Sequence, residues 1–246
     1  MAGKFSLLYT IVDFIKSLFG GRAKPSKDTS CVVVGMERSS KYGKCPGAKN
    51  DSNRMASLLA KHGKVRLLQD AQANTAMFRD ALEEACKKEL CILHYSGHGG
   101  LQGSHEFLCL NNGPFWDHQI WDIVSKAKGR VVLIFDCCHS GHMYRSSGID
   151  DLPEDRDIDI RHGFEFKLLM GPIVLSGNNI LVWSGCPKES FSYGDESGGV
   201  LTNGILSAYS PSKSYDKVWT EARRRAASQN PVRTILGSGF GGKVFR

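Results

Sequence analysis

The stretch VVLIFDCCHSGH, residues 131–142, contains the pattern that decides the fold. An apolar run leads directly into Asp136, two adjacent cysteines, a histidine and a glycine. Short, continuous apolar runs that end at a turn are typical of strands buried on both faces of a sheet. We therefore predict a strand over residues 130–137 that ends in chemically reactive side chains.

Further strands and helices alternate on both sides of this run. Strands are predicted at 31–36, 65–70, 90–97, 179–186 and 233–239, a short hairpin arm at 105–112, and helices at 48–63, 74–88, 116–129, 200–209 and 214–228. Strands that alternate with helices are typical of a mostly parallel sheet covered by helices on both faces. The sequence thus predicts an α/β fold.

The chain has 246 residues, which suffices for a single large α/β domain, and we assign residues 30–246 to it. Residues 1–29 form a separate amphipathic segment and linker. This segment is too short and too polar to span a bilayer, and three roles stay open for it: contact with a membrane surface, binding of a partner, and docking on the domain itself. An acidic stretch at about 143–178 is interpreted as an insertion or linker.

The composition argues against a disordered chain, a nucleic-acid-binding protein and a disulfide-rich secreted protein. Hydrophobic residues make up 41% and charged residues 23%, which are ordinary values for a globular chain. The net charge of +7 is concentrated in residues 211–246, and we interpret those charges as a solvated helix face instead of a nucleic-acid site, because no recognition motif accompanies them. Eight cysteines without a secretory signal predict mostly free thiols in a reducing, cytoplasmic setting.

Two predicted strands end in groups suited to catalysis. His98 follows the strand 90–97 and lies between two glycines, while Cys137 and Cys138 end the strand 130–137. Active sites of open parallel sheets gather beyond the carboxyl ends of the strands. If these two strands are neighbours, an imidazole and a thiol share one site, as a general base and a nucleophile require.

Side-chain alternation favours one cysteine over the other. Along a strand, Asp136 and Cys138 point to one side and Cys137 to the other. We therefore predict Cys138 as the nucleophile and Cys137 as its packed neighbour. The backbone N–H groups of Gly99 and Cys138 are predicted to stabilise the oxyanion.

The main chemical alternative is a zinc site. Its ligands would come from Cys137, Cys138, His139, His142 or His98. Adjacent cysteines form a chelate less readily than the spaced pairs of known zinc sites, so we predict no metal ligands here.

These motifs resemble the caspase-fold cysteine proteases and, within them, the metacaspases. The matching pieces are PGAKNDSNRM, YSGHGG, DCCHSG, WSGCPKESFSYG, GGVLTNGIL and QNPVRTILGSG, which cover roughly residues 30–240 in the family's order. The resemblance implies a caspase-like three-layer αβα sandwich with a six-stranded sheet. It also implies that a Cys/His dyad hydrolyses peptide bonds after arginine or lysine.

The resemblance further implies a substrate pocket for the basic side chain, formed by Asp51, Ser96 and Asp136. Two carboxylates that converge in a desolvated pocket repel each other, and an entering cation relieves this repulsion. The alternative for Asp51 is a carboxylate favoured by the helix dipole, and for Asp136 an acceptor that holds the turn.

Many metacaspases use calcium, bound by an acidic cluster after the catalytic histidine. Here Asp117 is followed by His118 and few other acids are present, so we expect the usual cluster to be incomplete. No cofactor is required by the sequence. Calcium stays possible, since the acidic stretch IDDLPEDRDID at 149–159 could supply a different site, but we interpret this stretch as solvated.

Three functional hypotheses remain. The first is an Arg/Lys-directed endopeptidase, expected as a monomer with protein substrates, that also cuts itself near Arg145, Arg156, Arg161 or Lys167. The second is a non-proteolytic binding or adaptor protein on the same fold. The third is a caspase-fold protease of another primary specificity.

Overall fold

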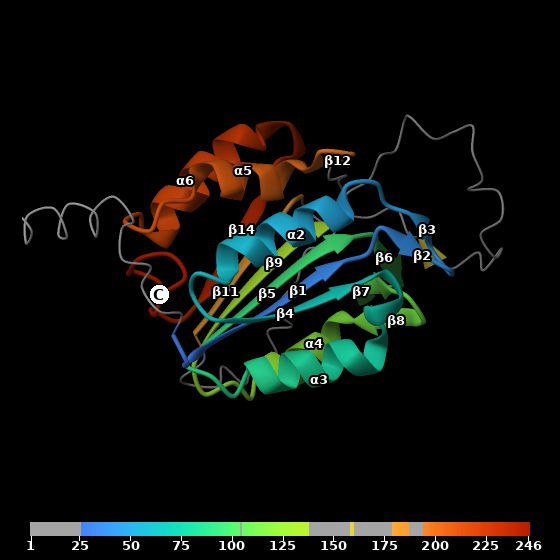
Figure 1. The fold of residues 1–246 in the computed structure, drawn as a ribbon, viewed down its shortest axis with the longest axis horizontal. Coiled ribbons are helices and arrows are strands. Elements are labelled where there is room, and N and C mark those ends of the chain that lie inside the picture. The colour runs from blue at the N-terminus through green and yellow to red at the C-terminus, as the bar shows by residue number, and fades with distance from the viewer. Residues whose placement is uncertain (1–25, 104, 138–157, 160–178, 187–193) are drawn as a thin grey trace, which may run out of the picture.

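A six-stranded sheet forms the centre of the molecule in the computed structural model (Figure 1). The structure describes residues 26–103, 105–137, 158–159, 179–186 and 194–246, with the backbone alone at 158–159. The strands of this sheet are β1 (Thr29–Gly35), β4 (Lys64–Gln69), β5 (Leu90–Gly97), β9 (Arg130–Cys137), β11 (Asn179–Ser184) and β14 (Val232–Leu236).

The strand order is β14-β11-β9-β5-β1-β4. Every neighbouring pair is parallel except β11 and β14, which are antiparallel. The mostly parallel six-stranded sheet that we predicted is therefore confirmed. β5 is buried along its whole length and β9 along all but its first residue, as expected of strands rich in aliphatic side chains in a sheet covered on both faces.

Helices cover the two faces of this sheet and complete the predicted three-layer sandwich (Figure 1). They are α2 (Ala48–Leu59), α3 (Thr75–Ala85), α4 (Asp117–Val124), α5 (Val200–Ala208) and α6 (Tyr215–Arg225), with short 3₁₀ turns at Asp70–Gln72 and Ala227–Gln229. One apolar cluster lies between the sheet and α3 and α4, and a second between the sheet and α2, α5 and α6.

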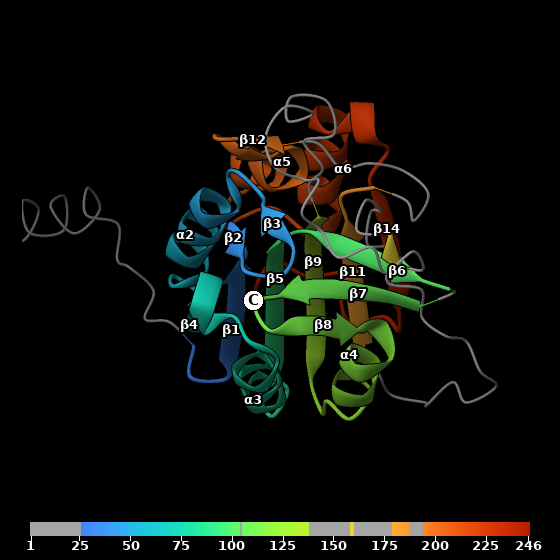
Figure 2. The same ribbon diagram turned by 90° about the vertical axis from the view of Figure 1, so that its right-hand side faces the viewer.

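A second, four-stranded antiparallel sheet follows the carboxyl end of β5, and in Figure 2 it extends in front of β5, β9 and β11 (Figures 1 and 2). It has the order β10-β6-β7-β8. Its strands are β6 (Gly99–Gln102), β7 (His105–Leu110), β8 (Gly113–Trp116) and β10 (Ile158–Asp159). The predicted hairpin arm at 105–112 corresponds to β7, whereas β6, β8 and β10 were not predicted.

Two small hairpins complete the architecture. One pairs β2 (Arg38–Ser39) with β3 (Gly43–Lys44), and the other pairs β12 (Gly194–Asp195) with β13 (Gly198–Gly199). Each strand has two residues, which is too short for an alternating pattern to be visible in the sequence.

Several predicted boundaries were wrong. The helix predicted at 48–63 ends at Leu59, because the chain turns at Ala60–Gly63 and brings Gly63 against the Thr29 backbone, where a Cβ would lie 2.3 Å from the Thr29 oxygen. The helix predicted at 116–129 ends at Val124. The last strand is Val232–Leu236 instead of 233–239.

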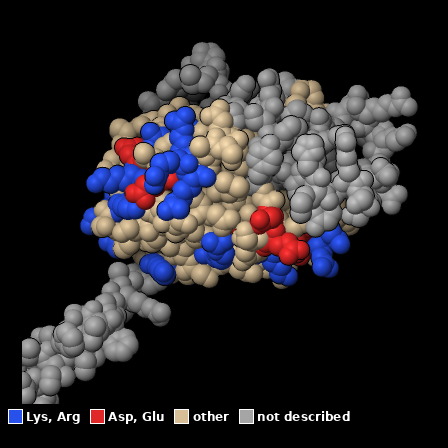
Figure 3. Space-filling view, turned by 90° about the horizontal axis from the view of Figure 1, so that it is seen from above, with Lys and Arg blue, Asp and Glu red and all other residues tan. Residues whose placement is uncertain are grey.

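The basic carboxyl-terminal region forms an exposed helix face, as we predicted. Arg223, Arg224 and Arg225 lie in the last turn of α6, and Lys and Arg side chains gather over this part of the surface (Figure 3). In the described part of the chain, no helix has the length and apolar character needed to cross a bilayer.

Candidate active site

The two strands predicted to carry the catalytic groups are neighbours in the central sheet. β5 and β9 are parallel, and their register places Ser96 beside Asp136 and Gly97 beside Cys137. His98 therefore directly follows Gly97, which is one member of the last register pair. Cys138 follows the other member, but Cys138, His139 and His142 lie outside the described residues.

His98 is partly buried and its ring is held by the β2–β3 hairpin. Its Nε2 atom lies 2.9 Å from the carbonyl oxygen of Lys44 at the end of β3. A carbonyl oxygen only accepts hydrogen bonds, so Nε2 carries the hydrogen and Nδ1 is the basic nitrogen of the neutral ring. Burial lowers the pKa of His98 and so favours this neutral form.

Two hydrogen bonds to its carbonyl oxygen fix the backbone of His98. The buried hydroxyl of Tyr95 donates to the His98 carbonyl oxygen at 2.7 Å, and the Cys109 N–H donates to the same oxygen at 3.1 Å. Sequence reasoning did not assign Tyr95 a role. A tyrosine inside the apolar run 90–97 could have indicated this contact, because a buried tyrosine hydroxyl requires a polar partner.

The glycines on either side of His98 serve different purposes. A Cβ on Gly97 would lie 2.7 Å from the Tyr95 hydroxyl and 2.8 Å from the Met36 Cβ, so only glycine fits there. Gly99 pairs with Leu108 across β6 and β7. Because Cys109 bonds to the His98 carbonyl, this is a non-hydrogen-bonded pair, and the Gly99 N–H points away from β7.

Cys137 is a packed core residue, as predicted. It is 4% exposed and belongs to the apolar cluster beneath α3 and α4. Burial raises the pKa of its thiol well above the ordinary value. A thiol held in the neutral form is a poor nucleophile and a poor metal ligand, which also argues against Cys137 in the zinc alternative.

Asp51, Ser96 and Asp136 meet on the opposite face of the sheet, and all three are fully buried. The Ser96 hydroxyl donates to Asp51 Oδ2 at 2.8 Å, which joins α2 to β5. Asp136 Oδ2 accepts a bond from the Thr202 N–H of α5 at 2.7 Å. The family resemblance implied that these three residues form one pocket, and the structure places them next to one another.

The Asp51 carboxyl group lies in an unusual electrostatic environment. Burial, followed by the neighbouring Asp136, raises its pKa to about 8. Its Oδ2 atom accepts two hydrogen bonds, whereas its Oδ1 atom is buried without a hydrogen-bond partner among the described residues. A carboxylate in this environment is strongly stabilised by an added cation.

The β12–β13 hairpin, which was not predicted from the sequence, packs against Asp51. The Gly199 N–H donates to Asp51 Oδ2 at 2.8 Å. Gly198 has a φ of 115°, and a Cβ there would lie 2.0 Å from Asp51 Oδ1, so glycine is required. The glycines of the GGVLTNGIL motif were the available signal for this contact.

Two further buried side chains, Cys45 and His94, lie near the acidic pair or its hydrogen-bond partner Thr202. Cys45 lies close enough to Asp51 and Asp136 for both carboxyl groups to contribute, after burial, to a raised thiol pKa. His94 contacts Thr202 Oγ1 at 3.0 Å, and burial lowers its pKa to about 3. His94 is therefore a neutral core residue.

A separate group at the rim of the second sheet contains metal-ligating side chains. Within the described ranges, His105, Asp117 and His118 present ligand atoms that all lie within 4.8 Å of one another. In the sequence, Asp117 and His118 stood out only as a departure from a calcium cluster. Their connection to His105 was not predicted.

Comparisons with known proteins agree with this architecture. A family model described as a caspase domain matches residues 29–238. No curated protein is found to match the chain.

Solved structures share the fold at low sequence identity. Protein GSU0716 from Geobacter sulfurreducens has a TM-score of 0.66 at 22% identity, covering 88% of this chain and 98% of its own. The Drosophila initiator caspase Dronc has a TM-score of 0.59 at 12% identity, covering 90% and 85%. Caspase-1 from Spodoptera frugiperda has a TM-score of 0.55 at 11% identity, covering 91% and 94%. The chain therefore belongs to the caspase-domain family and is a cysteine-type endopeptidase.

Proposed function

We propose that this endopeptidase cleaves peptide bonds after arginine or lysine, with Cys138 as the nucleophile and His98 as the base, as in metacaspases. The observation that carries the proposal is the buried pair of carboxyl groups on Asp51 and Asp136. A guanidinium or ammonium group is the partner that such a pair favours, and an aspartate side chain would be repelled.

Arg54 is a basic residue near the pair, but its guanidinium is engaged elsewhere. It donates to Ser197 O at 3.1 Å and to Asn203 Oδ1. Its effect on the pKa of Asp51 is the smallest of those acting on that group. Among the described residues, Arg54 thus leaves the charge of Asp51 largely uncompensated, which supports a basic substrate residue as its partner.

Covalent geometry supports the proposed dyad. Cys138 is the next residue in the chain after Cys137, whose register partner Gly97 directly precedes His98. Cys137 itself is buried in the apolar cluster and has a raised thiol pKa. Cys138 is thus the better candidate for the thiolate.

The proposed reaction proceeds in two stages. His98 Nδ1 takes the proton of the Cys138 thiol, and the thiolate sulfur attacks the scissile carbonyl carbon. The N–H groups of Gly99 and Cys138 stabilise the oxyanion, the C–N bond breaks, and the leaving amine takes the proton from His98. Water then attacks the thioester with His98 as base, releasing the carboxylate product and the thiol.

We propose that calcium is not needed for this activity. The Asp117 carboxylate accepts backbone N–H bonds from Glu106 and His118 and lies beside two imidazoles. Calcium prefers about six to eight oxygen ligands, and this arrangement does not offer them.

Reporter-peptide assays with the full-length chain test the proposal. Purified protein is assayed on matched peptides ending in arginine, lysine or aspartate before the reporter, with calcium or with a chelator. We expect cleavage of the arginyl and lysyl peptides in both buffers and its loss in His98→Ala. Preferential cleavage of the aspartyl peptide would overturn the proposed specificity, and activity in His98→Ala would overturn the dyad.

We further propose that the chain cuts itself in the acidic segment at about 143–178, where Arg145, Arg156, Arg161 and Lys167 are candidate sites. Of this segment the structure describes only the backbone at 158–159. Intact-mass measurements of wild type and Cys138→Ala after incubation decide the question. Finding only the uncut chain in both samples would reject self-cleavage.

A further inference from the structure

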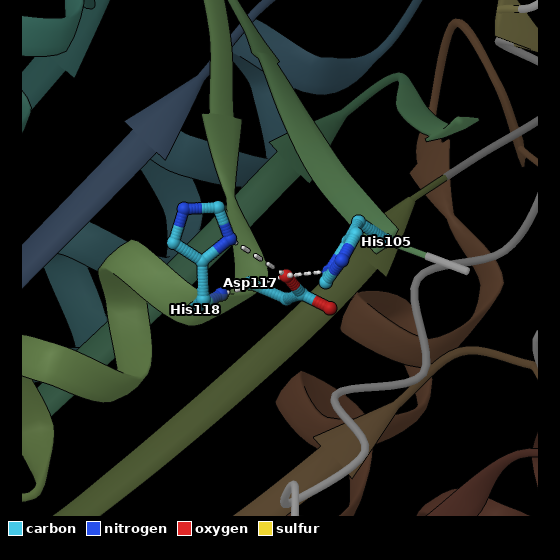
Figure 4. A group of neighbouring side chains, drawn as sticks. All are labelled: His105, Asp117 and His118. Carbon is cyan, nitrogen blue, oxygen red and sulfur yellow. Dashed lines mark hydrogen bonds and ion pairs between the residues drawn. The ribbon is translucent and has the colours of Figure 1, made fainter. Parts of the chain in front are cut away.

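We propose that His105, Asp117 and His118 bind a divalent transition-metal ion, and that zinc is the ion their ligand atoms suit best. The three side chains converge at the rim of the four-stranded sheet, with both imidazoles directed toward the Asp117 carboxylate (Figure 4). This site is separate from the acidic pair and the dyad, and the inference does not depend on the proposed cleavage specificity.

The β7–β8 hairpin explains why residues distant in sequence meet here. His105 is the first residue of β7, and Asp117 is the first residue of α4, immediately after β8. The antiparallel register pairs Phe107 with Trp116, so the residues before Phe107 lie alongside those after Trp116. The fold therefore holds one imidazole on a strand and the other two ligands at a helix start.

The distances are close to those of a bound ion. His105 Nδ1 lies 3.6 Å and His118 Nδ1 lies 3.5 Å from Asp117 Oδ1. Zinc bonds of about 2.0–2.1 Å in a tetrahedral arrangement separate neighbouring ligand atoms by about 3.3 Å. The three ligand atoms already lie within 4.8 Å of one another, so small side-chain rotations complete the geometry.

The carboxylate is positioned before any ion binds. Asp117 Oδ2 accepts the Glu106 N–H at 3.3 Å, and Oδ1 accepts the His118 N–H at 2.6 Å. The Asp117 side chain is only 10% exposed. Contacts of this kind orient a ligand and reduce the entropy lost on metal binding.

The imidazoles leave the site accessible. The His105 and His118 side chains are 51% and 48% exposed, so an ion can enter and keep a water molecule as its fourth ligand. The two rings meet edge to face with centroids 5.7 Å apart, and the His118 ring stacks on Trp116 at 6.3 Å. Two nitrogen ligands and one carboxylate suit zinc, whereas calcium requires more oxygen ligands.

Calorimetric titration of ZnCl₂ into the full-length chain tests the inference. Cys138→Ala with reduced thiols serves as the parent, because it removes a thiol that would compete for zinc. We expect one zinc ion per parent chain with a micromolar or tighter Kd. We expect no calcium binding at this site. His105→Gln, His118→Gln and Asp117→Asn should each weaken zinc binding at least about tenfold.

The matched control is the double variant His139→Ala, His142→Ala in the same parent, which removes two other histidines and should keep the zinc affinity. Circular dichroism of each variant verifies that it folds. His105 and His118 are exposed, so their substitution should disturb the fold little. Unchanged zinc affinity in both glutamine variants would overturn the inference. Loss of zinc binding in the control would overturn it as well, because it would place the ion elsewhere.

Discussion

The two faces of the central sheet differ in chemistry where β5 and β9 end. On the face covered by α3 and α4, Tyr95, Phe135 and Cys137 belong to one apolar cluster. On the face covered by α2 and α5, the buried groups are polar: Ser96 bonds to Asp51, and Asp136 bonds to the Thr202 N–H. The same two strands thus present packing on one side and charge on the other.

Burial raises the pKa of a group on each face, but only the carboxyl pair can be compensated by a bound cation. Burial of Cys137 raises its pKa and leaves it inert in an apolar environment. Burial of Asp51 beside Asp136 also raises a pKa, but a ligand cation reverses the effect. The polar face therefore gains from a bound substrate, whereas the apolar face contributes packing and, through Tyr95, holds the His98 backbone.

The largest difference in activity is expected between alanine substitutions of the two adjacent cysteines. Cys138→Ala should lower kcat/KM for an arginyl peptide by at least about 10⁴-fold, because the nucleophile is lost. Cys137→Ala removes only a packed thiol and should keep activity within a few fold. Steady-state kinetics on both variants measures this. If Cys137→Ala alone were inactive, the assignment of the two faces would be reversed.

Neutralising the acidic pair should have the next largest effect. Asp136→Asn and Asp51→Asn each remove one charge that faces the substrate cation, and we expect kcat/KM for the arginyl peptide to fall about 100-fold. Asp122→Asn, at an exposed position on α4, is the matched control and should have no effect. Equal activity of all three variants would show that the polar face does not select the substrate.

Asp51→Asn should also stabilise the fold at alkaline pH. The folded pKa of Asp51 is raised to about 8, above that of an unfolded carboxyl, so the folded chain holds a proton that the unfolded chain releases above about pH 4. The free energy of unfolding therefore falls as the pH rises from about 4 to about 8. Relative to a Cys138→Ala parent, Asp51→Asn should be nearly equal in stability at pH 4 and more stable by several kcal/mol at pH 8.

Urea unfolding across this pH range measures the difference. A parent that loses no stability relative to Asp51→Asn as the pH rises would contradict the raised pKa. The result also separates the two roles of Asp51, since the substitution is expected to increase stability while it decreases activity.

The smallest predicted effect concerns the apolar face. Tyr95→Phe removes the hydrogen bond from the Tyr95 hydroxyl to the His98 carbonyl and leaves the ring in place. Because this bond only positions the His98 backbone, we expect kcat to fall a few fold with KM unchanged. A change confined to KM would mean that Tyr95 acts on substrate binding instead.

Much of the central sheet could be predicted from the sequence because its strands are continuous apolar runs. The runs at 90–97 and 130–137 match β5 and β9 at both ends. Their adjacency, on which the prediction of a shared site depended, is confirmed by the register of Gly97 and Cys137. Alternation along β9 also placed Cys137 on the packed face correctly.

The remaining features depend on contacts that leave no local pattern. The β2–β3 and β12–β13 hairpins are too short to show periodicity, yet they bring the Lys44 carbonyl to His98 and the Gly199 N–H to Asp51. The His105, Asp117 and His118 group forms only because β7 and β8 pair, and β8 was not predicted. The role of Cys138 stays a prediction, since it lies outside the described residues.

The most direct test of the central claim compares arginine with its neutral isostere citrulline at the cleaved position of one reporter peptide. The two side chains have nearly the same shape, so the ratio of their kcat/KM values isolates the charge sensed by Asp51 and Asp136. We predict that arginine is preferred by at least about 100-fold and that Asp51→Asn removes most of this preference. Equal cleavage of both peptides by the wild type would contradict the account.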